Sequence, residues 1–366
     1  MSRLSLPATS YNRRMAQHPA DTMNDSWPDS LTQRGARQNS AGDWHFDPPP
    51  ASAAAHLIPL LREASLLVLG EDAESFLQGQ LSNDIRHVSA SQGQLAAYCT
   101  PKGRVLATLS VWPHDNGYVL RLPAELAAPI RQRLQIHVLR SRVVLEDISA
   151  DVAMLGLTGA QSVPLFREHF GTVPDSPFSV IRSAEIAAMA LPGDRIEVAV
   201  PCEQAIALWD RLAAAGCAPT GQEHWDRAAI AAGVATVLTA TSDQFIPQML
   251  NLELSGAVAF DKGCYPGQEI VARSQYLGQV KRRLRRFASR QPAQPGATLF
   301  MPEGSIGGMV VNVAPTPAGE YELLAVISQE AADGPLQLAQ DGSPLRRLPL
   351  PYELPAVPVR ESRGGG

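Results

Sequence analysis

The sequence predicts an α+β protein, with two mixed α/β units followed by a small C-terminal β-barrel. Two observations support this prediction. As far as about residue 280, apolar runs of strand length alternate with segments whose apolar residues recur at helical spacing. Beyond Lys281 the chain changes to short strand-like runs separated by proline and glycine, which is typical of a small barrel or sandwich. A chain of 366 residues can hold two or three domains.

The first unit combines strand and helix patterns. A polar turn over 113–117 joins two β-type runs and predicts a hairpin. We expect, in order, a strand at 65–69, a helix capped by Asp72 and carrying Phe76, Leu77 and Leu81, hairpin strands at 105–112 and 118–122, a helix carrying Leu126, Ile130, Leu134 and Val138, and a strand at 142–148.

The second unit repeats this mixture. Gly216 and Gly233 are the expected helix stops, because glycine readily takes the left-handed conformation at a helix C-terminus. We expect strands at 152–157, 186–191 and 195–200, a helix at 203–215 with Ile206, Trp209 and Leu212 inward, and a helix at 223–232; strands at 308–313 and 321–328 belong to the C-terminal β-unit.

These patterns divide the chain into five segments: three domains and two disordered ends. The first fifty residues are polar and lack apolar periodicity, so disorder is expected there. Arg13-Arg14 is followed by no apolar core of the length that a twin-arginine export signal needs. The expected division is a disordered 1–50, a first domain of 51–142 and 227–280, a second domain of 143–226, a β-barrel of 281–355 and a disordered tail of 356–366.

Charge and cysteine content restrict the class of protein. The formal net charge of -5 argues against a coat of basic residues for non-specific nucleic-acid binding. The four cysteines are scattered without a C-x-x-C pair, which excludes a zinc ribbon and a dithiol redox motif and favours reduced thiols in the cytoplasm. Because no apolar stretch reaches the length of a membrane span, we expect a soluble protein with no membrane partner.

The most informative motif is the run 261–270, which sets Cys264 in a turn rich in glycine and proline. We expect the thiol to be displayed rather than buried. Lys262, two positions earlier, and a helix N-terminus just after the cysteine both favour the thiolate over the thiol. The alternative is a small apolar side chain that fills a tight turn.

A short helix is expected directly after the thiol. Pro266 and Gly267 open this helix, since proline tolerates the first helical turn. The remaining expectations are that Gln268 and Glu269 occupy the first turn, that Ile270 and Val271 anchor the helix in the core, and that Arg273 faces outward.

Three sequence blocks together resemble the YgfZ proteins, folate-binding relatives of the glycine-cleavage aminomethyltransferase, GcvT. The blocks are 76–85 (FLQGQLSNDI), 96–104 (AAYCTPKGR), and the segment from 245–248 (FIPQ) through Asn251-Leu252 to 262–265 (KGCY) and 267–269 (GQE). The KGCY block is highly specific. The order and approximate spacing match over residues ~60 to ~350, with the usual looseness of such boundaries.

The resemblance implies a ring of three domains, two GcvT-like α/β domains and a β-barrel as the third, around a central channel that binds tetrahydrofolate. It assigns folate binding to the domain of 51–142 and 227–280. It also implies a role in assembling or repairing iron–sulfur clusters in client proteins, including a radical enzyme that thiomethylates tRNA. Cys264 matches the functional cysteine, with Lys262 beside it, and Trp225 matches an indole that contacts folate. The other motif positions are Gly263, Tyr265, Gly267, Gln268, Glu269 and Arg273; the other folate-site positions are Asn83, Asp84, Gln248, Asn251, Lys102 and Arg104.

Each candidate ligand residue has a structural alternative. Trp225 has the spacing of a helix core residue. Asp84 and Asn83 could bind a ligand amine or make the local bonds usual for such residues in a turn. Lys102 and Arg104 could bind the glutamate tail of folate or lie in solvent at a strand entry.

The chain departs from its relatives in three places. Residues 104–108 (RVLAT) lack the paired aspartates that aminomethyltransferases carry there. Ala231 stands where the family often has a glutamate, a natural partner for the donor edge of a pterin. The strand near Ser65 lacks the tryptophan that some relatives place before it.

Two further functions stay open. One is a tetrahydrofolate-dependent aminomethyl transferase, although the missing acidic pair near Ala107-Thr108 disfavours it. The other is an RNA or protein adaptor that uses the basic segment 281–286 (KRRLRR). Strand alternation would turn some of these cations inward, and no aromatic residues interleave with them, so direct tRNA contact has weak support.

Overall fold

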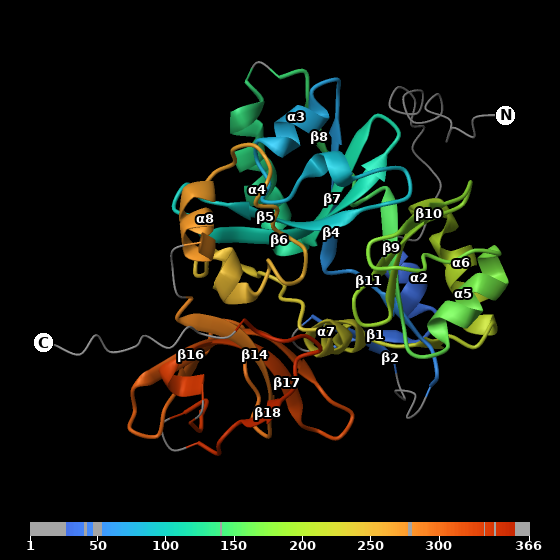
Figure 1. The fold of residues 1–366 in the computed structure, drawn as a ribbon. Helices are drawn as coiled ribbons and strands as arrows, with labels where there is room; N and C mark the ends of the chain where they lie inside the picture. Colours follow the sequence, from blue (N-terminus) through green and yellow to red (C-terminus); the bar gives the residue numbers. More distant parts are fainter. Residues whose placement is uncertain are drawn as a thin grey trace, which may run out of the picture.

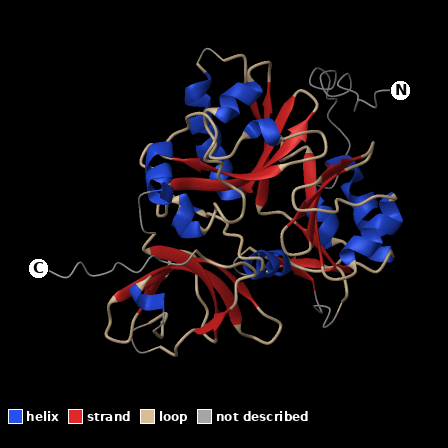
Figure 2. Cartoon of the chain, viewed as in Figure 1, coloured by secondary structure: helices blue, strands red, loops and turns tan. Residues whose placement is uncertain are grey.

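A computed structural model of the protein describes residues 27–39, 42–46, 53–139, 141–276, 280–332, 334–339 and 342–355. Its described strands form three large sheets and a two-stranded ribbon. In Figure 1 the large sheets lie at the corners of a triangle, with α7 (Gln222–Ala231) between the second and the third. Figure 2 shows helices gathered beside the first and second sheets, while strands dominate the third.

The first sheet has the antiparallel order β5-β6-β7-β4-β8. The predicted hairpin is confirmed as β6 and β7, whose pairing runs from Ser110↔Arg121 to His114↔Gly117. Helix α4 buries the predicted Leu126, Ile130, Leu134 and Val138. The elements are β4 (Glu63–Leu69), α3 (Ala73–Gln78), η1 (Ile85–His87), β5 (Gln94–Cys99), β6 (Val105–His114), β7 (Gly117–Pro123), α4 (Ala124–Val138) and β8 (Val144–Asp147).

The predicted capping of α3 by Asp72 is wrong. Asp72 precedes the helix with a backbone φ of -99° and ψ of 8° and makes no side-chain cap. Caps usually need an extended backbone at this position. The Asp72 carboxylate instead accepts a hydrogen bond from the Arg142 backbone N–H at 2.8 Å, which ties α3 to the segment before β8.

The second sheet has the order β10-β11-β12-β9-β3-β13. Its strand β3 comes from residues expected in the first domain, and it pairs with β9 from His56↔Thr158 to Pro59↔Leu155. Residues 56–59 therefore belong to the second sheet, although they were expected in the first domain. Its elements are β3 (His56–Pro59), β9 (Val152–Thr158), α5 (Ser162–Phe170), β10 (Val180–Arg182), β11 (Ala187–Leu191), β12 (Arg195–Pro201), α6 (Cys202–Ala214) and β13 (Ala218–Pro219).

Helix α6 packs on this sheet through one apolar face. Trp209 and Leu212 are buried as predicted, whereas Ile206 is only half-buried and Leu208 takes a core position instead. Gly216 follows the helix with φ of +101°, the left-handed conformation expected of its stop.

The prediction of disorder over 1–50 is wrong for the described part of that segment. Residues 27–46 contain α2 (Trp27–Thr32) and the paired strands β1 (Ala36–Gln38) and β2 (Trp44–Phe46). Trp27 packs edge-on against Trp209 at 5.7 Å between ring centroids, and Phe46 stacks on the same indole at 5.5 Å. A few aromatic side chains thus bury an otherwise polar segment. The rest of 1–50 and the predicted tail 356–366 lie outside the described residues.

The third sheet has the antiparallel order β15-β16-β17-β14-β18. No closed barrel is found among its described strands, because the edge strands β15 and β18 do not pair with each other. Isolated bridges at Gln337 are the only further pairing beside them in the described part of the chain. The predicted barrel and ring therefore stay predictions. The strands are β14 (Arg282–Ser289), β15 (Thr298–Phe300), β16 (Ile306–Pro315), β17 (Tyr321–Ser328) and β18 (Arg346–Leu348), with η4 (Glu330–Ala332) between the last two.

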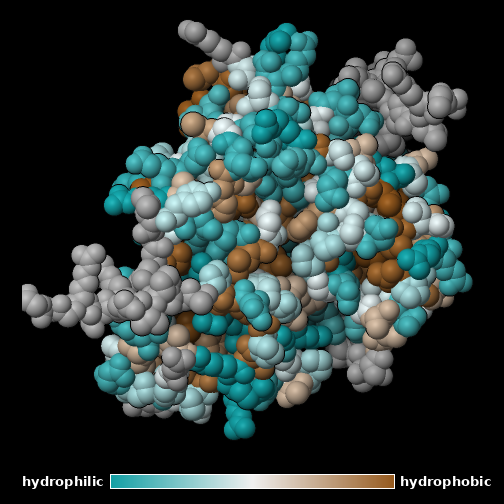
Figure 3. All heavy atoms as spheres, in the orientation of Figure 1, coloured by the Kyte–Doolittle hydropathy of each residue, from teal (hydrophilic) through white to brown (hydrophobic). Residues whose placement is uncertain are grey.

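One hydrophobic core connects the first and third sheets. It joins Leu66 and Leu120 of the first sheet to Leu284 and Val326 of the third, and the central segment contributes Phe245. In the described ranges no helix is both long and apolar enough to span a membrane. On the face drawn in Figure 3, apolar atoms form separate patches among hydrophilic side chains.

Candidate functional site

Cys264 is exposed, as the sequence predicted, in the loop that precedes α8 (Gln268–Tyr276). Its neighbour Gly263 is also exposed, whereas Tyr265 is buried and anchors the loop. Within the described chain, no three His, Cys, Asp or Glu side chains come together as a metal site. The loop thus presents a single thiol to solvent on a fixed backbone.

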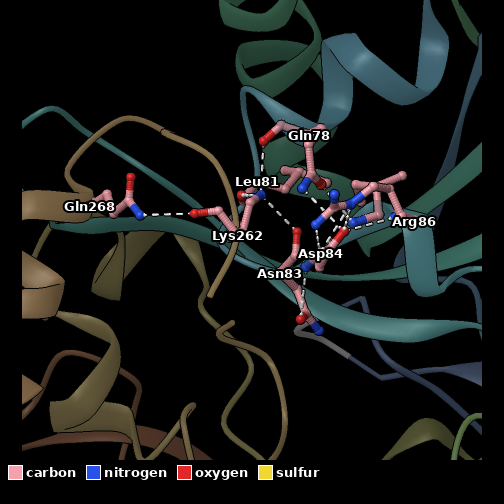
Figure 4. Close-up of polar contacts among 8 residues, drawn as sticks. Gln78, Leu81, Asn83, Asp84, Arg86, Lys262 and Gln268 are labelled. Carbon is pink, nitrogen blue, oxygen red and sulfur yellow. Dashed lines mark hydrogen bonds and ion pairs between the residues drawn. The ribbon is translucent and has the colours of Figure 1, made fainter. Parts of the chain in front are cut away.

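Lys262 ties this loop to the turn formed by residues 78–83 (Figure 4). Its buried ammonium donates to three backbone carbonyls, those of Gln78 at 2.8 Å, Leu81 at 2.6 Å and Asn83 at 2.8 Å. Burial lowers the pKa of Lys262 to about 8. All three N–H donors are used on carbonyls, so the side chain holds the loop; its predicted effect on the thiol stays a prediction.

Asn83 and Asp84 hold the turn that receives Lys262. The Asn83 amide donates to the carbonyls of Leu95 and Gly256, each at 2.7 Å. The Asp84 carboxylate accepts from Gln78 Nε2 at 3.1 Å and pairs with Arg86, whose hydrogen bond holds the pKa of this carboxyl well below its usual range. Both side chains are buried in internal bonds, which agrees with the turn alternative rather than ligand binding.

Gly267 brings two of the sequence blocks into direct contact. Its φ is +83°, so it is a left-handed turn residue and not, as predicted, the first residue of the helix. A methyl group added at Gly267 would lie 2.4 Å from the Thr100 carbonyl oxygen and 2.6 Å from Gly103 Cα. The same turn carries Lys102, which is exposed, and Arg104, which donates to the Gln244 carbonyl.

Helix α8 is anchored by one residue of the predicted pair. Val271 is fully buried, but Ile270 is 39% exposed, which corrects its predicted core position. Glu269 and Arg273 are exposed, the latter as predicted, and Gln268 Nε2 donates to the Lys262 carbonyl at 3.4 Å. A methyl group added at Gly103 would lie 3.0 Å from Ile270 Cβ, so the helix approaches the 100–104 turn closely here.

Gln248 and Asn251 are fully buried and join the first unit to the third. Gln248, in η3 (Pro247–Leu250), donates to the Val271 carbonyl at 2.7 Å. Asn251 donates to the Leu284 carbonyl at 3.1 Å and to the Tyr352 hydroxyl at 3.3 Å. Both amides therefore hold the fold together, and neither is in the lining of the cleft described below.

Trp225 is buried between the first and second sheets. A methyl group at Gly156 would lie 2.7 Å from Cε3 of the indole, and the Arg195 guanidinium lies 4.8 Å from the ring centroid. The indole belongs to a core cluster with Trp112, Met154 and other apolar side chains. Trp225 is therefore a buried helix residue of the core, which was the alternative to its contact with folate.

A buried charged group at the same interface was missed from the sequence. Arg121 of β7 and Glu197 of β12 pair at 3.2 Å, and both side chains are at least nine-tenths buried. Glu63 lies close to this pair, and its burial, opposed by Arg121 and reinforced by Glu197, raises its pKa to about 7. The available signal was a charged residue within each of two otherwise apolar strand runs: Arg121 in 118–122 and Glu197 in 196–200.

The central cleft is formed by residues from all three units and has a volume of about 800 Å³. Within it the His56 and His224 rings lie 4.5 Å apart, and burial with the Arg227 charge lowers the pKa of His224 to about 4. The sequence did not predict this cleft, because the residues that line it are far apart in the chain. Of them, only Ala231 was noted, as a residue that replaces a glutamate common in the family. The lining includes His56, Phe178, Asp194, His224, Arg227, Ala231, Arg286, Glu322 and Tyr352.

The basic segment 281–286 is divided between solvent and the interior. Arg283 pairs with Glu253, and Arg286 pairs with Glu322 at 2.5 Å. Lys281 and Arg282 are exposed at the start of β14. Because Arg283 and Arg286 form these ion pairs within the protein, the basic surface is smaller than the sequence suggested.

Comparisons with known proteins agree with this architecture. The family model described as the GCVT N-terminal domain matches residues 53–262. The tRNA-modifying protein YgfZ of Cronobacter sakazakii is 30% identical over 323 residues, covering 84% of this chain and 97% of that protein. Its counterpart from Yersinia pestis (strain Pestoides F) is 31% identical over 320 residues, covering 84% and 96%.

A solved structure shows the same fold. The glycine cleavage system aminomethyltransferase T from Bartonella henselae matches with a TM-score of 0.74 at 18% identity, covering 89% of this chain and 96% of that one. The three blocks around Cys264 lie within or beside the matched family model. The chain therefore belongs to the YgfZ family, whose curated relatives are named tRNA-modifying protein YgfZ, and it carries the GCVT N-terminal domain.

Proposed function

We propose that this protein binds a reduced folate and uses the Cys264 thiol in the assembly or repair of iron–sulfur clusters. The clients are a subset of enzymes that includes radical enzymes that thiomethylate tRNA. The observation that carries the proposal is the exposed Cys264 on a loop that Lys262 and Gly267 hold in place. Membership in a family named for tRNA modification supports the client class. The proposed compartment is the cytoplasm, where thiols stay reduced.

The design of the loop suits transient handling of a ligand rather than hydrolysis. A thiolate is a good ligand for iron and a good nucleophile, and its exposure allows a client protein to reach it. The nearby Lys262 ammonium is used on carbonyls, so the loop holds the Cys264 backbone without blocking the sulfur. Such a site can accept a cluster or a group and release it again.

The central cleft is suitable for a folate. Its volume lies within the usual range for sites that bind small molecules. Arg227 and Arg286 in its lining can hold the carboxylates of the glutamate tail, and Phe178 and Tyr352 offer aromatic surface. When bound, a reduced folate supplies a carrier for one-carbon units. The residues first assigned to the pterin, Trp225, Asn83 and Asp84, do not line this cleft.

The two alternative functions receive less support. Aminomethyl transfer lacks a carboxylate at the start of β6, where the chain has Leu106 and Ala107, both buried. An adaptor role through 281–286 is weakened because Arg283 and Arg286 are paired with acidic residues. Direct contact with tRNA therefore remains a secondary proposal.

The thiol is tested by complementation. A bacterial strain that lacks its own YgfZ would receive this protein or its Cys264→Ser variant, and the thiomethylated nucleoside in its tRNA would be measured. We expect the variant to lose complementation while its circular dichroism stays unchanged. Cys202→Ser, which changes a half-buried thiol on α6, is the matched control and should complement fully. Full activity of Cys264→Ser would remove the thiol from the function.

Folate binding is tested separately by calorimetry with 5-formyltetrahydrofolate, a stable reduced folate. We expect the unmodified protein and Cys264→Ser to bind equally, because the thiol is not part of the cleft lining. Arg227→Gln should weaken binding by removing a cation from the cleft, whereas Arg131→Gln on the exposed side of α4 should not. The absence of binding by the unmodified protein would exclude the folate assignment.

A further inference from the structure

Tyr352 lies between two cavities of the protein. It lines the central cleft, and it also lines a second groove of about 520 Å³ formed with Arg285 and residues 348–355. The residues before it run from the edge strand β18 back toward the first unit, where Leu350 packs against the shared core. Tyr352 is therefore part of the wall that closes the cleft on the side of the third unit.

The orientation of Tyr352 is fixed by its hydroxyl group. The hydroxyl donates to the Gly233 carbonyl at 2.8 Å and accepts from Asn251 Nδ2 at 3.3 Å. A methyl group added at Gly233 would lie 2.7 Å from Cε1 of the tyrosine, so the ring contacts the end of α7 directly. The cleft residues at the end of α7, Ala231 and its C-cap Ala232, have short side chains.

The other aromatic residues of the cleft already have partners. Phe178 packs against the core cluster that contains Trp225. The His56 and His224 rings contact each other in a tilted arrangement, with 4.5 Å between their centroids. Tyr352 has no ring partner among the described residues and belongs to none of their core clusters. Its ring is partly exposed, lines the cleft and is fixed in orientation, so it offers a preorganised aromatic surface to a ligand.

We propose that Tyr352 is the residue on which the flat ring system of the cleft ligand stacks, in the role that the sequence assigned to Trp225. The inference rests on the proposed folate site and goes beyond it, because it names a contact residue from the C-terminal segment. The class of ligand is a planar heteroaromatic ring with an anionic tail. Arg227 and Arg286 in the same lining are placed to bind such a tail.

The test separates the ring of Tyr352 from its hydroxyl. Tyr352→Phe and Tyr352→Leu both lose the bonds to Gly233 and Asn251, so thermal unfolding should show similar losses of stability for the two. Calorimetry with 5-formyltetrahydrofolate should then show that Phe keeps affinity within about threefold while Leu loses about tenfold, since stacking needs the ring. Trp225→Phe should bind like the unmodified protein, because its indole is enclosed by Gly156 and Arg195.

Several results would contradict the inference. Unchanged binding by Tyr352→Leu, or equal losses in Phe and Leu, would show that the ring makes no contact with the ligand. A loss of binding in Trp225→Phe with normal binding in Tyr352→Leu would return the stacking role to the indole and leave the folate assignment intact. No binding by the unmodified protein would overturn the folate assignment itself and this inference with it.

Discussion

Arg121 and Glu197 form a buried ion pair, 3.2 Å apart, that joins the first sheet to the second. Arg121 belongs to β7 of the first sheet and Glu197 to β12 of the second, so the pair bridges the two sheets. Three Arg121 nitrogens and Glu197 Oε2 have no hydrogen-bond partner in the protein. The two charges therefore depend on each other.

Removal of one partner should be costly. Glu197→Ala removes the carboxylate that pairs with the buried Arg121 guanidinium and leaves only Glu63 as a nearby acidic group. We expect a loss of about 3–5 kcal/mol in the free energy of unfolding, as is typical of a broken buried pair. Urea unfolding monitored by circular dichroism measures this loss. The double variant Arg121→Met with Glu197→Leu should be more stable than Glu197→Ala. A Glu197→Ala protein as stable as the unmodified one would show that the pair does not join the units.

Substitution by alanine should destabilise the protein at Gly267 but not at Gly263, although both glycines lie in the Cys264 loop. Gly267→Ala places a methyl group 2.4 Å from the Thr100 carbonyl oxygen at a φ of +83°, and we expect a destabilisation of about 2 kcal/mol or more. At Gly263 an added methyl group meets no atom within 4 Å, so Gly263→Ala should change stability by less than about 0.5 kcal/mol. Thermal unfolding compares the two. Equal effects would contradict the close packing of Gly267 on the 100–104 turn.

The parts of the fold predicted well are those fixed by local pattern. The 105–122 hairpin and the helix of Leu126 and Leu134 follow from periodicity and turn residues alone. Tertiary partners decided the rest: β3 pairs with a strand some hundred residues away. The exposure of Cys264 was predicted from its glycine-rich turn, but the direction of Lys262 depended on three carbonyls in another block of sequence.

Substitution of Lys262 should destabilise the Cys264 loop, because its side chain makes three hydrogen bonds that hold the loop. Lys262→Met leaves three carbonyls without their donor, and we expect a loss of about 2–4 kcal/mol, because hydrogen bonds to a buried charged group are among the stronger ones. Hydrogen exchange should show faster exchange at 78–84 and 261–265 than in the unmodified protein. Lys102→Met, at an exposed lysine of the adjacent turn, is the control. Unchanged exchange in Lys262→Met would mean that other contacts hold the loop.

Glu63 should give the protein a pH-dependent stability that a single substitution removes. Its pKa is raised to about 7 in the folded protein, chiefly by burial, whereas an unfolded glutamate titrates near 4.5. Below about pH 4.5 both states hold the proton and Glu63 costs nothing. As the pH rises toward about 7 the unfolded chain loses its proton first, so the free energy of unfolding falls, and above about pH 7 the full cost is present.

Glu63→Gln isolates this contribution from the other titrating groups. His224 acts in the opposite direction over part of the range, because its folded pKa of about 4 lies below its ordinary value. The measurement is therefore the difference between the unfolding free energies of Glu63→Gln and the unmodified protein at pH 5, 6, 7 and 8. Because Glu63 is half-buried, we expect the variant to gain about 1–2 kcal/mol relative to the unmodified protein between pH 5 and pH 8. A difference that stays constant with pH would show that Glu63 titrates normally beside the Arg121–Glu197 pair.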